Sequence, residues 1–172
     1  EKPFADLDSL QRITAACRDN GVGFMDGTHF VHHPRTAAIR AAIPEKVGRP
    51  TSIASAFQFF IADTSNIRLN PALEPLGAIG DVGWYNVRAA VEYTRPDVEI
   101  ESVDAFARRH PETNAIVEAS GLIVFSDAST TTFHCGFESR ALNMDCRIAG
   151  SLGQISMWNF IINDADGLAG TT

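Results

Sequence analysis

The sequence has little positive charge, few cysteines and no long apolar run. Its 172 residues include 14 Lys and Arg against 21 Asp and Glu, which gives a formal net charge of −7. Such a protein is a poor partner for nucleic acid or for an anionic membrane, because few cations remain to contact phosphates. No apolar stretch approaches the roughly 18 residues of a membrane-spanning helix, and no signal-peptide pattern is visible. We therefore expect neither a nucleic-acid nor a membrane partner.

Metal-binding patterns are missing as well. The three cysteines, Cys17, Cys135 and Cys146, are widely spaced, and an odd number cannot be fully paired in disulfides. The histidines of residues 29–33 are not at the spacing with which a helix presents two ligands, and no carboxylate or cysteine completes a set. We predict no metal site, and we predict reduced thiols of the kind found in cytoplasmic proteins.

The first part of the chain carries helix and turn signals. Apolar side chains at three- and four-residue spacing predict a helix over residues 4–20. Asp8 and Gln11 resemble a capping box at its start, and Gly21 is a typical residue for its end. A short apolar strand is expected over residues 22–25.

The remaining residues predict an open sheet. In chain order we expect a helix over residues 36–43 opened by Pro34 and ended by Pro44, a strand over 51–62, a loop over 63–76, a helix over 79–93, and strands over 98–107, 114–126, 130–138, 142–149 and 154–160. The short spacing of the later strands favours antiparallel pairing. Residues 130–137 alternate between apolar and small polar side chains, so one face would carry helices and the other can contact a second subunit. The predicted fold class is α+β, a mostly antiparallel open β-sheet with helices on one face.

A glycine-rich stretch holds the residues with the clearest chemistry. Residues 77–85 read Gly-Ala-Ile-Gly-Asp-Val-Gly-Trp-Tyr, and glycines let the backbone approach another group closely. In a helix, Asp81 and Tyr85 are four residues apart and lie on one face. A phenol beside a charged partner can act as a general acid or base. Arg68, the only cation of the preceding loop, suits recognition of an anion or hydroxyl, although a solvated loop charge is an open alternative.

This stretch resembles the Asp-x-Gly-x-His/Tyr signature of the Gfo/Idh/MocA family of NAD(P)-dependent oxidoreductases. The likeness is greatest to its glucose–fructose oxidoreductase and dimeric dihydrodiol dehydrogenase branch, and to the plant-type proteins of that branch. Further segments agree with the family in the same order: residues 1–3 (Glu-Lys-Pro), 25–28 (Met-Asp-Gly-Thr), 31–36 (Val-His-His-Pro-Arg-Thr) and 66–73 (Asn-Ile-Arg-Leu-Asn-Pro-Ala-Leu). Together they cover most of the chain.

The resemblance implies a division of the chain into two parts. Residues 1–27 would be the last helix and strand of a Rossmann-type NAD(P)-binding domain, and residues 28–172 a catalytic and oligomerisation α+β domain that associates through its sheet. No Gly-x-Gly-x-x-Gly turn is present, and this turn is what holds a dinucleotide pyrophosphate. We therefore expect an interior fragment of a larger enzyme, inactive by itself.

The resemblance also implies roles for individual residues. Lys2 and Tyr85 would transfer the proton and Asp81 would orient a sugar, polyol or diol substrate, while NAD or NADP exchanges the hydride. Lys2 would also lie near the cofactor.

Three further side chains are candidates with weaker support. Arg68 and His29 are candidate substrate contacts, and Trp84 is a candidate wall of the nicotinamide site, with packing as its alternative. Many family members have an arginine where this chain has Val31, which leaves the substrate open. Two alternatives to an enzyme also stay open, namely a ligand-sensing protein of the same fold and a module that dimerises through its sheet.

Overall fold

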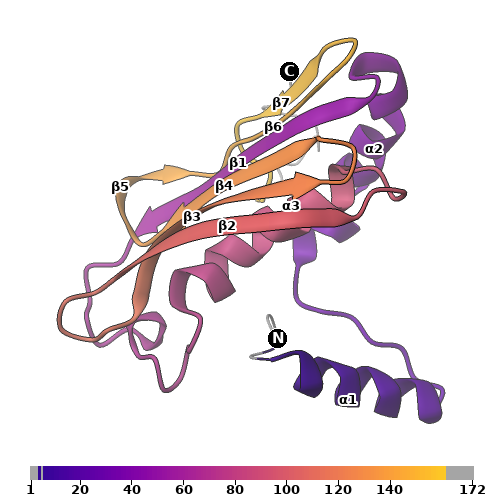
Figure 1. Cartoon of the computed structure of the whole chain (residues 1–172). Coiled ribbons are helices and arrows are strands. Elements are labelled where there is room, and N and C mark those ends of the chain that lie inside the picture. The colour runs from indigo at the N-terminus through magenta and orange to yellow at the C-terminus, as the bar shows by residue number, and fades with distance from the viewer. Residues whose placement is uncertain (1–3, 5, 162–172) are drawn as a thin grey trace.

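The structure is a computed structural model that describes residue 4 and residues 6–161 (Figure 1). Its α-helices are α1 (Leu7–Asp19), α2 (Pro34–Lys46) and α3 (Trp84–Tyr93), and its strands are β1 (Pro50–Phe60), β2 (Ile100–Arg109), β3 (Ile116–Phe125), β4 (Thr130–Gly136), β5 (Glu138–Asn143), β6 (Cys146–Gly150) and β7 (Gln154–Met157). Two short 3₁₀ helices, η1 (His29–His32) and η2 (Ile67–Leu69), and a π-helical turn, η3 (Ile79–Gly83), complete the described elements.

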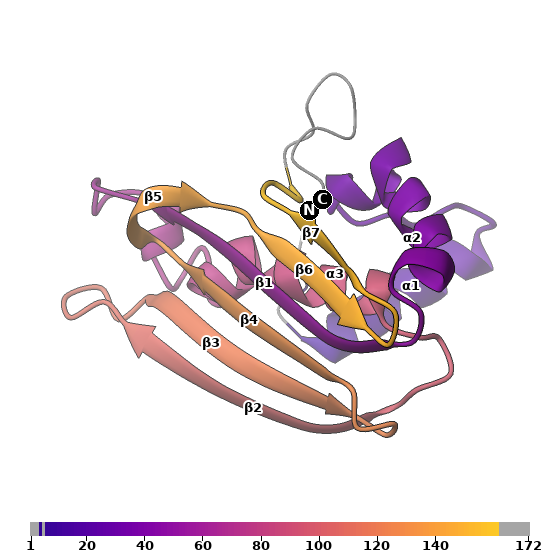
Figure 2. The same cartoon turned by 90° about the horizontal axis from the view of Figure 1, so that it is seen from above.

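The strands form one open sheet in the order β2-β3-β4-β1-β6-β7, and β5 pairs with one end of β1. Every pairing is antiparallel except that of β1 with β4. Helices α2 and α3 lie against one face, and no helix among residues 6–161 covers the other face (Figure 2). The predicted α+β class, with a mostly antiparallel sheet and helices on one face, is confirmed. The parallel pair was not anticipated, because it depends on where the chain returns after α3, β2 and β3.

Two apolar clusters join the helices to the sheet. One lies between η1, α2, α3 and the β1-β6-β7 side, where Phe30, Ile148 and Phe160 are almost fully buried. The other lies between η3 and the β3-β4 side around Val82 and Phe137. Burying one such side chain stabilises the fold by roughly 1.5–3 kcal/mol. The two clusters fix α3 along the middle of the sheet.

The N-terminal helix lies apart from the sheet (Figure 1), and none of its residues is buried. Asp6 caps it by accepting a hydrogen bond of 2.7 Å from the backbone N–H of Ser9, so the predicted cap at Asp8 is wrong by two residues. Gly21 has a φ of 64°, which confirms it as the residue that ends the helix. Residues 22–25 are coil rather than the predicted strand. A strand needs a neighbour to pair with, and no described strand lies beside this segment.

Two further boundaries differ from the prediction. Pro44 lies inside α2, which continues to Lys46. A proline in the last turn removes only one helical hydrogen bond, and the N–H groups of Val47 and Gly48 both bond to the carbonyl of Ile43 to end the helix. The single strand expected over 142–149 is instead the end of β5 followed by β6, because the two strands pair with different parts of β1.

The cysteines are free thiols, as predicted. Burial raises the pKa of the Cys135 thiol to about 12 and that of Cys146 to about 12, so both are inert packing residues. Of the helices in the described part of the chain, none has the length and apolarity needed to cross a membrane.

Candidate active site

The glycine-rich stretch positions the start of α3 by packing tightly on the sheet. Gly77 has a φ of 48°, and a Cβ there would lie 2.3 Å from the carbonyl oxygen of Ile116. A Cβ on Gly83 would lie 2.9 Å from Sγ of Cys135. The close approach that the glycines allow is therefore to strands β3 and β4. The chain between them forms the π-helical turn η3, a feature that is frequent at functional sites.

Asp81 lies in this π-helical turn and pairs with Arg68. Nε of Arg68 donates to Oδ2 of Asp81 at 2.5 Å. Arg68 is held in turn by η2, where the side chain of Asn66 accepts a hydrogen bond from its backbone N–H and the neighbouring Leu69 is buried. Both partners keep some exposure, 38% for Arg68 and 19% for Asp81. Arg68 is thus not a solvated loop charge; it fixes the orientation of the carboxylate that the sequence singles out.

Tyr85 lies one turn further along and reaches His29. The phenol oxygen is 3.2 Å from Nδ1 of His29, and the two rings meet edge to face with centroids 5.4 Å apart. Phe57 and Phe30 pack on the tyrosine ring, which is only 8% exposed. His29 is exposed. The phenol is therefore not sealed in hydrocarbon, because its oxygen contacts a side chain that faces solvent.

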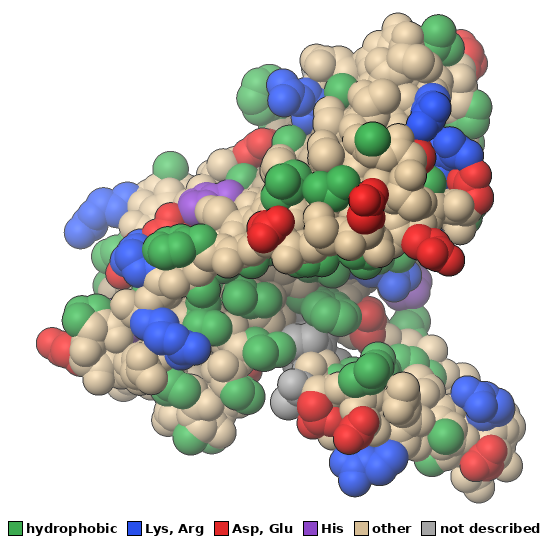
Figure 3. Space-filling view, viewed as in Figure 1, with side chains coloured by type: hydrophobic (Ala, Val, Ile, Leu, Met, Phe, Trp, Pro, Cys, Tyr) green, Lys and Arg blue, Asp and Glu red, His purple; other side chains and the backbone are tan. Residues whose placement is uncertain are grey.

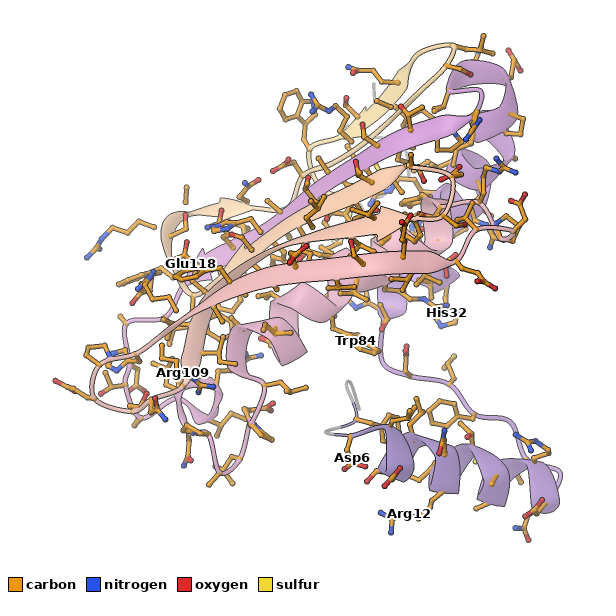
Figure 4. The ribbon with its side chains drawn as sticks, viewed as in Figure 1. Asp6, Arg12, His32, Trp84, Arg109 and Glu118 are labelled. Atoms are coloured by element: carbon orange, nitrogen blue, oxygen red, sulfur yellow. The ribbon has the colours of Figure 1, made fainter. Side chains whose placement is uncertain are left out.

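Asp26 is a third polar group beside α3, and the sequence did not single it out. It belongs to the segment that precedes η1. Asp26 accepts a hydrogen bond of 2.9 Å from the backbone N–H of Thr28. Burial favours the neutral carboxyl, but the N–H and hydroxyl of Thr28, the charge of Arg88 and the indole of Trp84 outweigh it and lower the pKa of Asp26. Figure 4 shows Trp84 on α3 beside the segment that links α1 to η1. The Asp-Gly-Thr turn at residues 26–28 is the signal that identifies this carboxylate in the sequence.

Several polar atoms near Asp26 are buried but incompletely bonded. Within residues 6–161, Nε1 of Trp84, Oγ1 of Thr28 and Nε of Arg88 form no hydrogen bond of normal geometry, although the first two lie close enough to Asp26 to favour its ionised form. Buried polar atoms are normally satisfied. The half-buried indole of Trp84 leaves a flat face on which a planar ring can stack.

The predicted site residues are therefore distributed as follows. Two polar pairs lie at the start of α3, Asp81 with Arg68 and Tyr85 with His29. Trp84 lies between Asp81 and Tyr85 in the sequence. Lys2 lies outside the described residues. No group of three or more His, Cys, Asp and Glu side chains suited to a metal occurs in the described part of the chain. The arrangement supplies a phenol, an imidazole and an oriented carboxylate, which is a set suited to proton transfer.

Comparison with known proteins identifies relatives for this arrangement. Residues 36–156 match the model of the GFO/IDH/MocA C-terminal domain. A dTDP-3,4-didehydro-2,6-dideoxy-alpha-D-glucose 3-reductase from Actinomadura kijaniata is 28% identical over 159 residues, which are 91% of this chain and 47% of that protein. D-xylose 1-dehydrogenase (NADP(+)) 2 from Haloferax volcanii is 26% identical over 141 residues, covering 81% of this chain and 42% of that protein. The chain thus spans about half the length of the curated relatives it matches.

The fold has close structural counterparts as well. The crystal structure of KijD10, a 3-ketoreductase from Actinomadura kijaniata, in complex with NADP and TDP-benzene superposes with a TM-score of 0.84 at 24% identity. The match covers 94% of this chain and 49% of that chain. An aldose-aldose oxidoreductase from Caulobacter crescentus complexed with glycerol superposes with a TM-score of 0.75 at 18% identity, covering 92% of this chain and 48% of that one.

Proposed function

The chain belongs to the GFO/IDH/MocA family, and from this membership we propose that it is the substrate-binding half of an NAD(P)-dependent oxidoreductase acting on a sugar, polyol or diol. The observation that carries the proposal is the pairing at the start of α3. There the Asp-x-Gly-x-Tyr stretch presents a carboxylate held by Arg68 and a phenol hydrogen-bonded to His29. The relatives that are named as sugar reductases and dehydrogenases support the substrate class.

The proposed chemistry divides the work among few groups. Bound NAD or NADP would supply or accept the hydride. Tyr85 would hold the proton that moves to or from the reacting oxygen of the substrate. Lys2 would lower the pKa of the phenol by its charge. Asp81, fixed by Arg68, would bind a neighbouring hydroxyl and so orient the substrate.

The contacts with substrate and cofactor follow from the same geometry. Arg68 keeps 38% of its side chain exposed, so it can also meet a hydroxyl of the substrate, and we assign His29 to the same wall. Trp84 would hold the nicotinamide ring, because its half-buried indole offers a flat face on which a planar ring can stack. Lys2 would approach the same ring.

We propose a domain boundary near residue 27. Residues 1–27 would belong to the Rossmann-type NAD(P)-binding domain and residues 28–172 to the catalytic domain, since α1 buries nothing against the sheet. The plant-type branch, suggested by residues 25–36, is our assignment within the family. A cytoplasmic enzyme is consistent with the free cysteines.

The coenzyme's pyrophosphate would be bound by residues outside this sequence, which has no Gly-x-Gly-x-x-Gly turn. We therefore expect the 172-residue chain alone to bind NADP only weakly. Isothermal titration calorimetry of the isolated chain checks this expectation. Tight binding of NADP would show that the division into two domains is wrong.

The decisive experiment replaces Tyr85 with phenylalanine in the protein encoded by the complete reading frame. We expect the kcat for NAD(P)H production from a panel of sugars and polyols to fall roughly 10²- to 10⁴-fold. The substitution removes the hydroxyl that transfers the proton and keeps the packing of the ring. Tyr93→Phe is the matched control, since it removes the hydroxyl of a buried tyrosine at the other end of α3. Wild-type protein that turns over no substrate of the panel would favour a ligand-sensing relative instead.

A further inference from the structure

We propose that His29 and Tyr85 form a proton relay, in which His29 carries the proton between solvent and the phenol. The inference rests on the proposed function and adds a residue to it, because His29 is assigned a part in proton transfer rather than in substrate binding alone. Tyr85 is almost fully buried, whereas the imidazole hydrogen-bonded to it is exposed.

The burial of Tyr85 limits how its proton can reach water. Phe30 and Phe57 cover its ring, and aromatic neighbours neither accept nor donate the proton of a phenol. The oxygen lies 3.2 Å from Nδ1 of His29, within hydrogen-bond reach. A neutral imidazole with its proton on Nε2 accepts the phenol proton at Nδ1. Because the ring is exposed, Nε2 remains available to water.

The backbone holds His29 in place for this contact. The two flanking residues, Thr28 and Phe30, are both fully buried, so the exposed imidazole sits on a fixed support. Oγ1 of Thr36 donates a hydrogen bond of 2.7 Å to the carbonyl of Phe30, which ties η1 to α2. A ring on a fixed backbone that contacts a buried phenol is preorganised for proton transfer.

The neighbouring histidines do not share this position. Nδ1 of His33 accepts a hydrogen bond of 3.1 Å from the backbone N–H of Arg35 and caps α2. His32 lies at the end of η1 and is exposed. His29 alone of the three forms a ring contact and a hydrogen bond with Tyr85 in the described part of the chain.

The relay conserves protons and electrons. During reduction of a carbonyl substrate, the Tyr85 O–H bond breaks and its proton goes to the substrate oxygen, leaving a phenolate. The phenolate takes the proton from Nδ1 of His29 while Nε2 takes one from solvent, so the imidazole stays neutral and ends with its proton on Nε2. Exchange of that proton with water returns the ring to its starting tautomer. During oxidation of the alcohol the same steps run in reverse. The electron pair moves with the hydride of the proposed reaction, so no other oxidant or reductant is needed.

Kinetics of the protein from the complete reading frame test the relay. We expect His29→Asn, which keeps a hydrogen-bonding group near Nδ1 but cannot carry a proton, to lower kcat roughly 10-fold or more, a larger effect than any change in KM. In His29→Ala, added imidazole should restore much of the lost kcat, which replacement of a purely structural side chain would not show. His32→Asn is the matched control and should behave as wild type.

NMR spectroscopy tests the contact between His29 and Tyr85 independently of enzyme activity. In ¹⁵N NMR of histidine-labelled protein, Tyr85→Phe should move the Nδ1 signal of His29, identified by its loss in His29→Asn, and leave that of His32 in place. An unmoved His29 signal would overturn the relay. A His29→Asn variant with wild-type kcat, together with no imidazole rescue in His29→Ala, would also overturn the relay. If Tyr85→Phe were inactive in that case, the proposed function would stand without the relay. Absence of turnover in wild type would instead remove the proposed function and the relay together.

Discussion

At the scale of single residues, the site depends on two positions where a Cβ is absent. Gly77 and Gly83 bring the start of α3 against strands β3 and β4, and this contact sets where Asp81 and Tyr85 point. The sequence indicated that these glycines permit a close approach to something. It did not indicate that the neighbour is the sheet, because the partner atoms, in Ile116 and Cys135, come much later in the chain.

We predict that Gly77→Ala destabilises the fold by at least about 1–2 kcal/mol, the cost of a left-handed conformation for an L-residue. The added Cβ would also lie 2.3 Å from the carbonyl oxygen of Ile116, so strand β3 or the turn must move. Urea unfolding followed by circular dichroism measures the change. Gly23→Ala is the control, because its Cβ meets nothing within 4 Å. Equal midpoints for the two variants would contradict the tight contact.

At the scale of elements, sequence periodicity predicted the middle of most helices and strands but not their irregular ends. The helix expected over 79–93 is present as the π-helical turn η3 followed by α3. Apolar spacing cannot distinguish a π-helical turn from an α-helical one over five residues, because two turns so short place similar side chains toward the sheet. The strand expected over 142–149 joins the end of β5 to β6, because side-chain alternation does not show where a chain changes its pairing along β1.

Asp127, in the turn between β3 and β4, allows a test of how the stability of the fold changes at low pH. The side-chain hydroxyl and backbone N–H of Ser129 bond to Asp127 and, together with the charge of Arg49, lower the pKa of its carboxyl from 3.8 to about 2. Arg49 precedes β1 and Arg95 follows α3, and both reach the same carboxylate. The ionised Asp127 thus joins three elements across the end of the sheet.

A depressed pKa means that Asp127 stabilises the fold above pH 3.8 and loses this contribution as the pH falls toward 2. We therefore expect the free energy of unfolding of wild type to decline more steeply over this range than that of Asp127→Asn. Urea unfolding at a series of pH values measures both. Asp104→Asn, on the exposed edge strand β2, serves as the control. Parallel curves for wild type and Asp127→Asn would contradict the assignment.

At the scale of the whole molecule, the fold class could be predicted from the sequence, whereas the contacts of the candidate site residues could not. Asp81 and Tyr85 were singled out by local spacing and by the family resemblance. Their contacts with Arg68 and His29 join residues 13 and 56 positions apart. Such contacts depend on how η1 and η2 fold back on α3, and nothing in a local pattern encodes that path.

The open face of the sheet is the surface through which we propose that the protein forms a homo-oligomer. Phe106 on β2 is 70% exposed and Leu122 on β3 lies on the same face. Beside them Nε2 of His134 is 3.0 Å from Glu118, and Oγ of Ser120 is 2.6 Å from Nδ1 of the same imidazole. Figure 3 shows hydrophobic side chains between charged ones on the visible surface of the sheet. A face whose polar groups already have partners loses little when it is covered.

We predict that Phe106→Glu lowers the oligomeric state of the protein encoded by the complete reading frame, because a carboxylate without a partner is costly to bury in an interface. Sedimentation velocity at several concentrations measures the mass of wild type and variant. Val91→Glu is the matched control, since Val91 is 64% exposed but lies on α3, on the opposite side of the sheet. A wild type that sediments as a monomer, or a Phe106→Glu variant that keeps the wild-type mass, would show that this face is not the interface. Loss of association in both variants would point to a general loss of solubility rather than to the sheet.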